Sequence, residues 1–138
     1  MGKNLSPREV DALLPKLEGI FLHMDACRKR VYELAATRPP PNAHPTATEV
    51  ADSARIRSQM EFLLRAVRDD IALVSQLGGT VKDIDAGLVD FPGRVDDEDV
   101  WLCWKRSENK IHYWHPLDAG FSERQTLQRS EDRTSTTH

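Results

Sequence analysis

The sequence has few cysteines, no long apolar run and no pattern of a secretory signal. Among its 138 residues only Cys27 and Cys103 are cysteines, too few for a disulfide framework and without the spacing of a zinc knuckle. We therefore expect both thiols to be reduced. No apolar stretch approaches the ~20 residues that a membrane-spanning helix needs, and residues 1–22 lack a basic segment followed by an apolar one. These absences predict a soluble, cytoplasmic protein with no membrane partner.

An excess of positive charge is also absent. The chain has 19 lysines and arginines against 22 acidic residues, a net charge of -3 and a pI near 5.9. Because a protein that binds duplex nucleic acid needs a basic surface, we do not expect duplex nucleic acid as a partner. The sequence also lacks a phosphate-binding glycine loop, a dinucleotide fingerprint and a Ser-His-Asp order. We therefore predict none of the common organic cofactors.

The first element that the sequence predicts is a helix whose N-terminus is marked by its residues. Ser6 and Glu9 form a capping box, and Pro7 takes the first helical position, where no backbone donor is missed. Apolar residues then recur at steps of three and four as far as the segment before Thr37. We predict one long helix over residues 7–37.

A second helix is predicted over residues 47–77. Thr46 and Glu49 repeat the capping box, and two consecutive glycines end the segment. The proline-rich residues 38–45 cannot be helical, because successive prolines lock extended geometry and remove donors. Two helices of similar length joined by a short stiff spacer should lie antiparallel.

The apolar stripe of the first helix is wider than one antiparallel neighbour and a small sheet can cover. We therefore expect Leu13, Ile20 and Leu34 to be partly exposed in a monomer. A second copy of the chain would bury them, which predicts a homodimer.

Beyond residue 79 the apolar period changes from 3.6 to 2. Residues 88–91, 100–105 and 111–115 are β-prone, the first run is closed by a Pro-Gly pair, and residues 107–110 read as a hairpin loop. With that loop, one face would carry Leu102, Trp104, Tyr113 and His115, and the other Trp101, Cys103, His112 and Trp114.

The predicted fold class is α+β: a long antiparallel two-helix hairpin followed by a small antiparallel β-sheet. We expect a single domain over residues 1–127, with the hairpin over 7–78 and the sheet over 79–127. Residues 128–138 are rich in Ser, Thr and charge and are expected to be a disordered tail. The acidic residues 96–99 are interpreted as a solvated loop.

Several short motifs resemble those of one bacterial family. They are Gly79-Thr-Val-Lys-Asp83, Gly87-Leu-Val-Asp-Phe-Pro92, Leu102-Cys-Trp-Lys105, Glu108, Trp114-His115 and Gly120-Phe-Ser-Glu-Arg-Gln125, with Leu13-Leu-Pro15 in the first helix. Together they resemble the family known as domain of unknown function 2203, over roughly residues 5–127. The resemblance implies a small bacterial cytoplasmic protein with a helical first half and implies no activity. Ser107 departs from it, because the family carries glycine before the glutamate.

The candidate site is a set of polar side chains in or beside the predicted sheet: Asp90, Glu108, His115 and Arg124, with Asp83 and Trp104 as further candidates. Carboxylates with one imidazole suit Mn, Fe or Zn, but their spacing matches no metal motif, so we predict no metal site and keep a divalent ion as the alternative. The interpretation that we favour is structural. In it the aspartates cap turns, the glutamate begins the hairpin and the arginine pairs with a buried carboxylate.

The shape of that site follows from strand geometry. A rise of ~3.3 Å per residue puts Glu108 well over ~10 Å from His115 along their hairpin. We therefore expect an elongated polar groove for a small anionic or hydrogen-bonding ligand instead of a tight metal centre. Cys103 has no base placed beside it by the sequence and is interpreted as a small buried hydrophobe. The sheet aromatics are expected to be core, with a stacking pocket as the alternative.

Two classes of function remain open at this point. The first is a homodimeric interaction, assembly or structural domain, which we favour. The second is a small-molecule-binding protein or a metal-dependent hydrolase that uses the polar site on the sheet. No residue is assigned a catalytic role.

Overall fold

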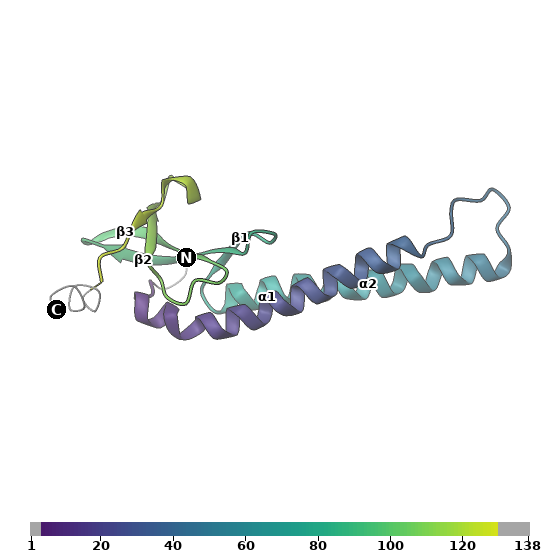
Figure 1. Cartoon of the computed structure of the whole chain (residues 1–138), viewed down its shortest axis with the longest axis horizontal. Coiled ribbons are helices and arrows are strands. Elements are labelled where there is room, and N and C mark those ends of the chain that lie inside the picture. Colours follow the sequence, from purple (N-terminus) through teal and green to yellow (C-terminus); the bar gives the residue numbers. More distant parts are fainter. Residues whose placement is uncertain (1–3, 130–138) are drawn as a thin grey trace. The chain divides into compact units, whose positions relative to one another are not determined.

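A computed structural model describes residues 4–129 of the chain (Figure 1). Two long helices are followed by five short strands and one turn of 3-10 helix. The elements are α1 (Pro7–Ala36), α2 (Ala47–Gln76), β1 (Thr80–Asp83), β2 (Leu88–Val95), β3 (Glu98–Lys105), β4 (Tyr113–Pro116), η1 (Phe121–Glu123) and β5 (Gln125–Thr126). The α+β class and the two-helix start predicted from periodicity are confirmed. No helix of the described part is long and apolar enough to cross a bilayer.

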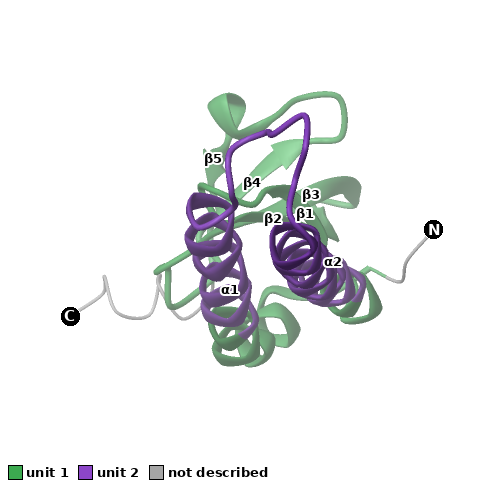
Figure 2. Cartoon of the chain, turned by 90° about the vertical axis from the view of Figure 1, so that its right-hand side faces the viewer, with its two compact units in different colours: residues 1–19, 73–138 green, residues 20–72 purple. Residues whose placement is uncertain are grey.

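The chain forms two compact units, which Figure 2 shows in different colours. One contains the described residues up to 19 together with those from 73 onward, and the other contains residues 20–72. The sheet, the N-terminal part of α1 and the C-terminal end of α2 belong to the first unit. Residues 130–138 of the expected tail lie outside the described residues.

Both predicted capping boxes are formed. The Glu9 carboxylate accepts from the Ser6 N–H at 2.8 Å, and the Ser6 hydroxyl accepts from the Glu9 N–H at 3.1 Å. The same reciprocal pair joins Thr46 and Glu49 at 3.0 and 3.1 Å, and the backbone donor at Thr46 lowers the pKa of Glu49. These bonds satisfy orphan donors of each first turn, which explains why the helix starts were predictable.

Within the unit of residues 20–72 the two helices run antiparallel. His23 of α1 pairs with Asp70 of α2, and Leu34 of α1 lies beside Ser58 of α2. Residue numbers therefore increase along α1 in the direction in which they decrease along α2. Ile20 and Leu34 are buried in the single chain, at 7% and 6% exposed, while Leu13 is half-buried. The expectation that Ile20 and Leu34 would be partly exposed in a monomer was therefore wrong.

The five strands form one antiparallel sheet in the order β1-β2-β3-β4-β5. Asp96 and Asp97 adopt positive φ angles and form a two-residue turn between β2 and β3, as expected of a solvated acidic loop. The prediction that Pro92-Gly93 closes the strand was wrong, because β2 continues to Val95. Proline has no backbone N–H to donate to a neighbouring strand. Pro92 is tolerated because β1 pairs with β2 only as far as Asp90, so no β1 carbonyl lies opposite Pro92 to accept a hydrogen bond.

The pairing of β3 with β4 differs by one residue from the predicted register. Cys103, not Trp104, lies opposite Tyr113, and Trp101 lies opposite His115. The connection covers residues 106–112 instead of four residues, because Ile111 is fully buried and its N–H donates to Asp11 of α1 at 2.8 Å. A shift of one residue moves a side chain to the opposite face of the sheet. His115 therefore shares a face with Cys103 and not with Trp104.

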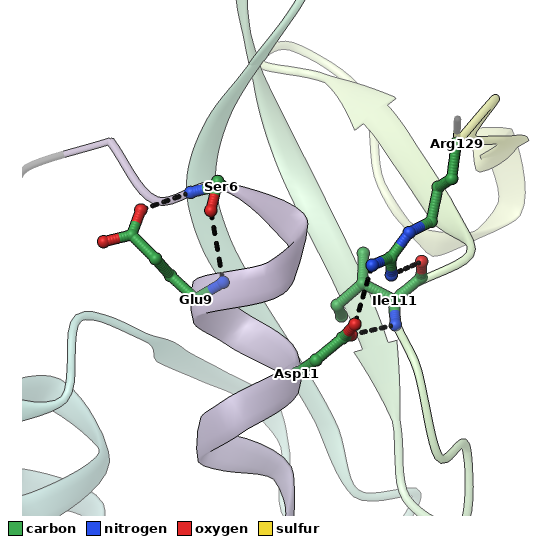
Figure 3. A network of polar contacts seen from close by, with 5 residues as sticks. All are labelled: Ser6, Glu9, Asp11, Ile111 and Arg129. Atoms are coloured by element: carbon green, nitrogen blue, oxygen red, sulfur yellow. Dashed lines mark hydrogen bonds and ion pairs between the residues drawn. The ribbon is translucent and has the colours of Figure 1, made fainter. Parts of the chain in front are cut away.

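The first turns of α1 are tied to the last described residues of the chain (Figure 3). The Asp11 carboxylate accepts from the Ile111 N–H and from the Arg129 guanidinium, the latter at 2.7 Å. Arg129 also donates to the Ile111 carbonyl at 2.9 Å, and the residue is only 4% exposed. Arg129, which falls in the segment expected to be a tail, is thus packed into this unit.

Candidate functional site

Three buried polar side chains meet on one face of the sheet. Asp90 of β2 lies directly opposite Cys103 of β3, and His115 of β4 lies opposite Trp101, two residues from Cys103 on the same face. Their ligand atoms all lie within 4.8 Å of one another. The three residues are 3%, 1% and 2% exposed, in the order Asp90, Cys103, His115. A carboxylate, a thiol and an imidazole thus lie together at one buried site.

The opposite face of the same strands is the apolar core of this unit. It carries Val89, Phe91, Leu102 and Trp104, each fully buried. Alternation along a strand separates these side chains from the polar set. The site is therefore built on rigid, centrally paired strands.

The imidazole of His115 has an acceptor at each of its nitrogens. Its Nδ1 lies 3.0 Å from the Pro116 carbonyl, and its Nε2 lies 3.0 Å from Oδ2 of Asp90. A carbonyl can only accept, so Nδ1 carries a proton. A neutral ring then presents a lone pair at Nε2 to a carboxylate oxygen, which is repulsive. The contact is satisfied by a proton between Nε2 and Oδ2, carried by either group, or by a cation bound to both.

The thiol of Cys103 is held in its protonated form. Burial, together with the neighbouring Asp90 carboxylate, raises the pKa of Cys103 to about 11, while Arg124 acts in the opposite direction. A free thiolate nucleophile at neutral pH is therefore disfavoured. A cation bound at this place would reverse that balance, since a coordinated thiol loses its proton.

Glu108 and Arg124 form a second pair on the sheet. Their side chains lie 3.2 Å apart, and the other oxygen of Glu108 accepts from the Lys105 N–H at 2.7 Å. The guanidinium of Arg124 is stacked between two rings, 3.9 Å from the Tyr113 centroid and 4.3 Å from the Phe121 centroid. This pair closes the hairpin and fixes the last loop, although the carboxylate is half-buried and not buried as predicted.

The two further candidates have structural roles. Asp83 accepts from the Ala86 N–H at 3.0 Å and caps the turn between β1 and β2. Trp104 lies in the core, and its indole N–H donates to the Glu108 carbonyl at 2.8 Å. Ser107 keeps the left-handed φ of 85° that glycine favours, and the Glu18 carboxylate accepts from its N–H. The departure at Ser107 therefore leaves the turn intact.

A small cavity of about 220 Å³ opens beside the buried polar side chains. Asp90, Cys103 and His115 contribute to its wall together with Lys82 and several apolar side chains, and its exposed surface is at least as polar as it is apolar. Glu108 and Arg124 do not line it. Of the four principal candidates, the structure thus brings Asp90 and His115 together at a cavity, while Arg124 pairs with Glu108 and donates to the Cys103 sulfur.

Cys103 is the site residue that the sequence reasoning missed. It was placed on the face opposite His115 because the hairpin register was assumed from a four-residue loop. The alternation in β2 contains a signal for it. Asp90 interrupts an otherwise apolar run and must face away from the core, and Cys103 lies directly opposite Asp90 on that face.

Comparison with known proteins places the chain in a family without an assigned activity. Residues 3–127 match the model of the uncharacterized conserved proteins DUF2203, and the chain belongs to that family. The resemblance seen in its short motifs is thereby confirmed. No curated protein and no solved structure matches the chain.

Proposed function

We propose that the protein binds a divalent transition-metal ion of the zinc class at Asp90, Cys103 and His115, and that the ion holds a small molecule in the adjoining cavity. The observation that carries this proposal is the convergence of three different metal-ligand types, all buried, within 4.8 Å. Asp90 and His115 already contact each other, and a cation would bind both of them together with the Cys103 sulfur.

The geometry needs only a small adjustment to accept the ion. Zinc lies ~2.0–2.3 Å from oxygen, nitrogen and sulfur ligands, which sets tetrahedral ligands roughly 3.3–3.8 Å apart. Ligand atoms within 4.8 Å of one another can reach this spacing by moving about 1 Å. The bond from Nδ1 of His115 to the Pro116 carbonyl is the support that orients a metal-binding imidazole.

Three protein ligands leave one coordination position for a water or a small molecule. This number is typical of sites that act on or hold a ligand, whereas purely structural zinc sites use four protein ligands. Apart from the three proposed ligands, the described cavity wall has no carboxylate or imidazole that could serve as a base. The arrangement therefore favours binding over hydrolysis.

Metal binding can be measured on untagged protein with Zn²⁺ and with Co²⁺ as a spectroscopic substitute. We expect one ion per chain, a sulfur-to-cobalt charge-transfer band, and about 2.7 kcal/mol of added stability at a free Zn²⁺ concentration of ~100 times Kd. Cys103→Ala should abolish the band and lower the affinity by more than about 100-fold, since a direct ligand contributes more than its supporting contacts do. Cys27→Ala, which removes the other buried cysteine, is the matched control and should bind like the wild type.

Asp90→Asn provides a variant that is expected to fold. An amide can donate to Nε2 of the neutral His115 ring, so the buried pair stays satisfied without its charge. The variant should unfold cooperatively near the wild-type temperature and fail to bind either ion. The proposal is wrong if the wild type binds no ion, or if both site variants bind as tightly as Cys27→Ala.

A second candidate function is assembly as a homodimer through the helices. Its support is a set of exposed large apolar side chains within residues 20–72: Leu22, Tyr32, Val50, Phe62 and Leu64. Among them, Phe62 lines a hollow together with Leu34 and Leu63, which is an apolar spot that a second copy would cover. Because Ile20 and Leu34 are buried within the single chain, the dimer interface would have to be formed by these exposed side chains instead.

The dimer makes a direct prediction of mass. Sedimentation equilibrium at micromolar concentration should give twice the chain mass for the wild type. Phe62→Lys should shift the protein toward the monomer, because it puts a charge where apolar area would be buried. Glu61→Lys introduces the same side chain at the neighbouring exposed position and should leave the mass unchanged. A wild-type monomer at that concentration would exclude the dimer.

A further inference from the structure

Part of the wall of the cavity beside the proposed metal ligands is apolar, and polar groups supply at least as much of its exposed surface. Six residues supply that part of the lining: Leu88, Trp101, Leu117, Ala119, Gly120 and Phe121. Leu117 and Phe121 are 55% and 39% exposed and lie at the opening. A volume of about 220 Å³ corresponds to roughly seven waters at ~30 Å³ each. The cavity therefore fits a molecule of about seven to ten non-hydrogen atoms.

Two cationic side chains act at the same cavity: Lys82 in its lining, and Arg124, which donates to the Cys103 sulfur and has its charge balanced by Glu108. Lys82 is part of the lining, and its Nζ lies 5.7 Å from the centroid of the Trp101 ring. Ligation of a divalent ion by one carboxylate, one thiolate and a neutral imidazole is charge-neutral. Lys82 then gives the cavity a positive charge, which favours a monoanion over a neutral molecule.

Resting on the proposed metal site, we infer that the molecule it holds is a small monocarboxylate with an aromatic or branched aliphatic body. The carboxylate occupies the fourth position on the ion and is attracted by Lys82. The body lies against Trp101 and Phe121, where it displaces water from apolar surface. The charge of Lys82 favours this class over neutral polar metabolites, and the rings of Trp101 and Phe121 favour it over phosphates, which have no apolar body.

Benzoate is a suitable probe because it combines a carboxylate with a ring of the right size. Added to the untagged Co²⁺-loaded protein, it should shift the visible cobalt bands in a saturable manner. Benzamide, which has the same shape without the charge, should bind at least about tenfold more weakly. Lys82→Met should weaken benzoate binding by about tenfold and leave the cobalt spectrum without benzoate unchanged, since Lys82 is not among the proposed metal ligands.

The two proposals fail in distinguishable ways. A cobalt spectrum that forms normally but does not respond to benzoate, or that responds equally to benzamide, overturns the inference about the ligand and leaves the metal site standing. Absence of cobalt binding before any benzoate is added overturns the proposed function and this inference with it. An equal benzoate affinity in Lys82→Met contradicts the charge argument on which the ligand class depends.

Discussion

Replacement of Trp104 by alanine is expected to destabilise the protein more than any other single change considered for the sheet. The side chain is fully buried, and its removal leaves a large cavity that costs about 3–5 kcal/mol. Loss of the indole N–H also leaves the Glu108 carbonyl without this donor, which adds about 1–3 kcal/mol. Because a whole domain is stable by only about 5–15 kcal/mol, the variant should be partly or wholly unfolded.

Trp104→Phe separates the two contributions. Phenylalanine retains an aromatic ring in the core but cannot donate to the Glu108 carbonyl, so we expect a loss of only about 1–3 kcal/mol. Urea denaturation followed by circular dichroism measures both values. If Trp104→Ala kept nearly full stability, the residue would belong to a ligand site on an exposed surface and not to the core.

The buried pair of Asp11 and Arg129 should show the second large effect. Asp11→Ala removes the carboxylate partner of a guanidinium whose side chain is 3% exposed and also the acceptor of the Ile111 N–H. Removing one partner of a buried ion pair costs about 3–5 kcal/mol. Arg129→Ala should cost less, because the Asp11 side chain is 21% exposed, is solvated more readily and keeps its bond to Ile111.

A double-mutant cycle tests whether the two residues act on each other. The double variant should lose less stability than the sum of the single variants, with a coupling of about 1–3 kcal/mol. Gln128→Ala, at the exposed neighbour of Arg129, is the control and should change stability by less than about 0.5 kcal/mol. Additive single effects would mean that the contact contributes nothing to folding. A large loss in Arg129→Ala would also show that a domain ending at residue 127 is too short.

The ends of the two helices could be predicted from the sequence because local interactions determine them. Each capping box is formed by residues three positions apart, so no knowledge of the rest of the fold was needed. The end of α2 is equally local, since Gly78 adopts a φ of 101° and the Gly79 N–H donates to the Val74 carbonyl at 3.1 Å. The turn at Asp96 and Asp97 and the cap at Asp83 belong to the same class of features, whereas Glu98 and Asp99, predicted as part of the loop, lie in β3.

Half of the candidate site was also predictable. Asp90 and His115 are polar residues within β-prone runs, and such residues need a partner when the strands are buried. That they partner each other depends on which strands are neighbours and in which register, and neither follows from the spacing of the residues. The sequence placed Glu108 and Arg124 in the same set, whereas the structure uses them to close the hairpin.

The sequence by itself determined the two helices, their limits, the change to a sheet and the residue types available for chemistry. Only the tertiary structure decided that Cys103 joins Asp90 and His115. The physical reason is that Ile111 is drawn into the core and bonded to Asp11, a contact between residues 100 positions apart. This contact lengthens the loop and shifts the pairing of β3 and β4 by one residue. Since alternate residues of a strand face opposite sides, the shift of one position moves the imidazole from the side of Trp104 to the side of the thiol.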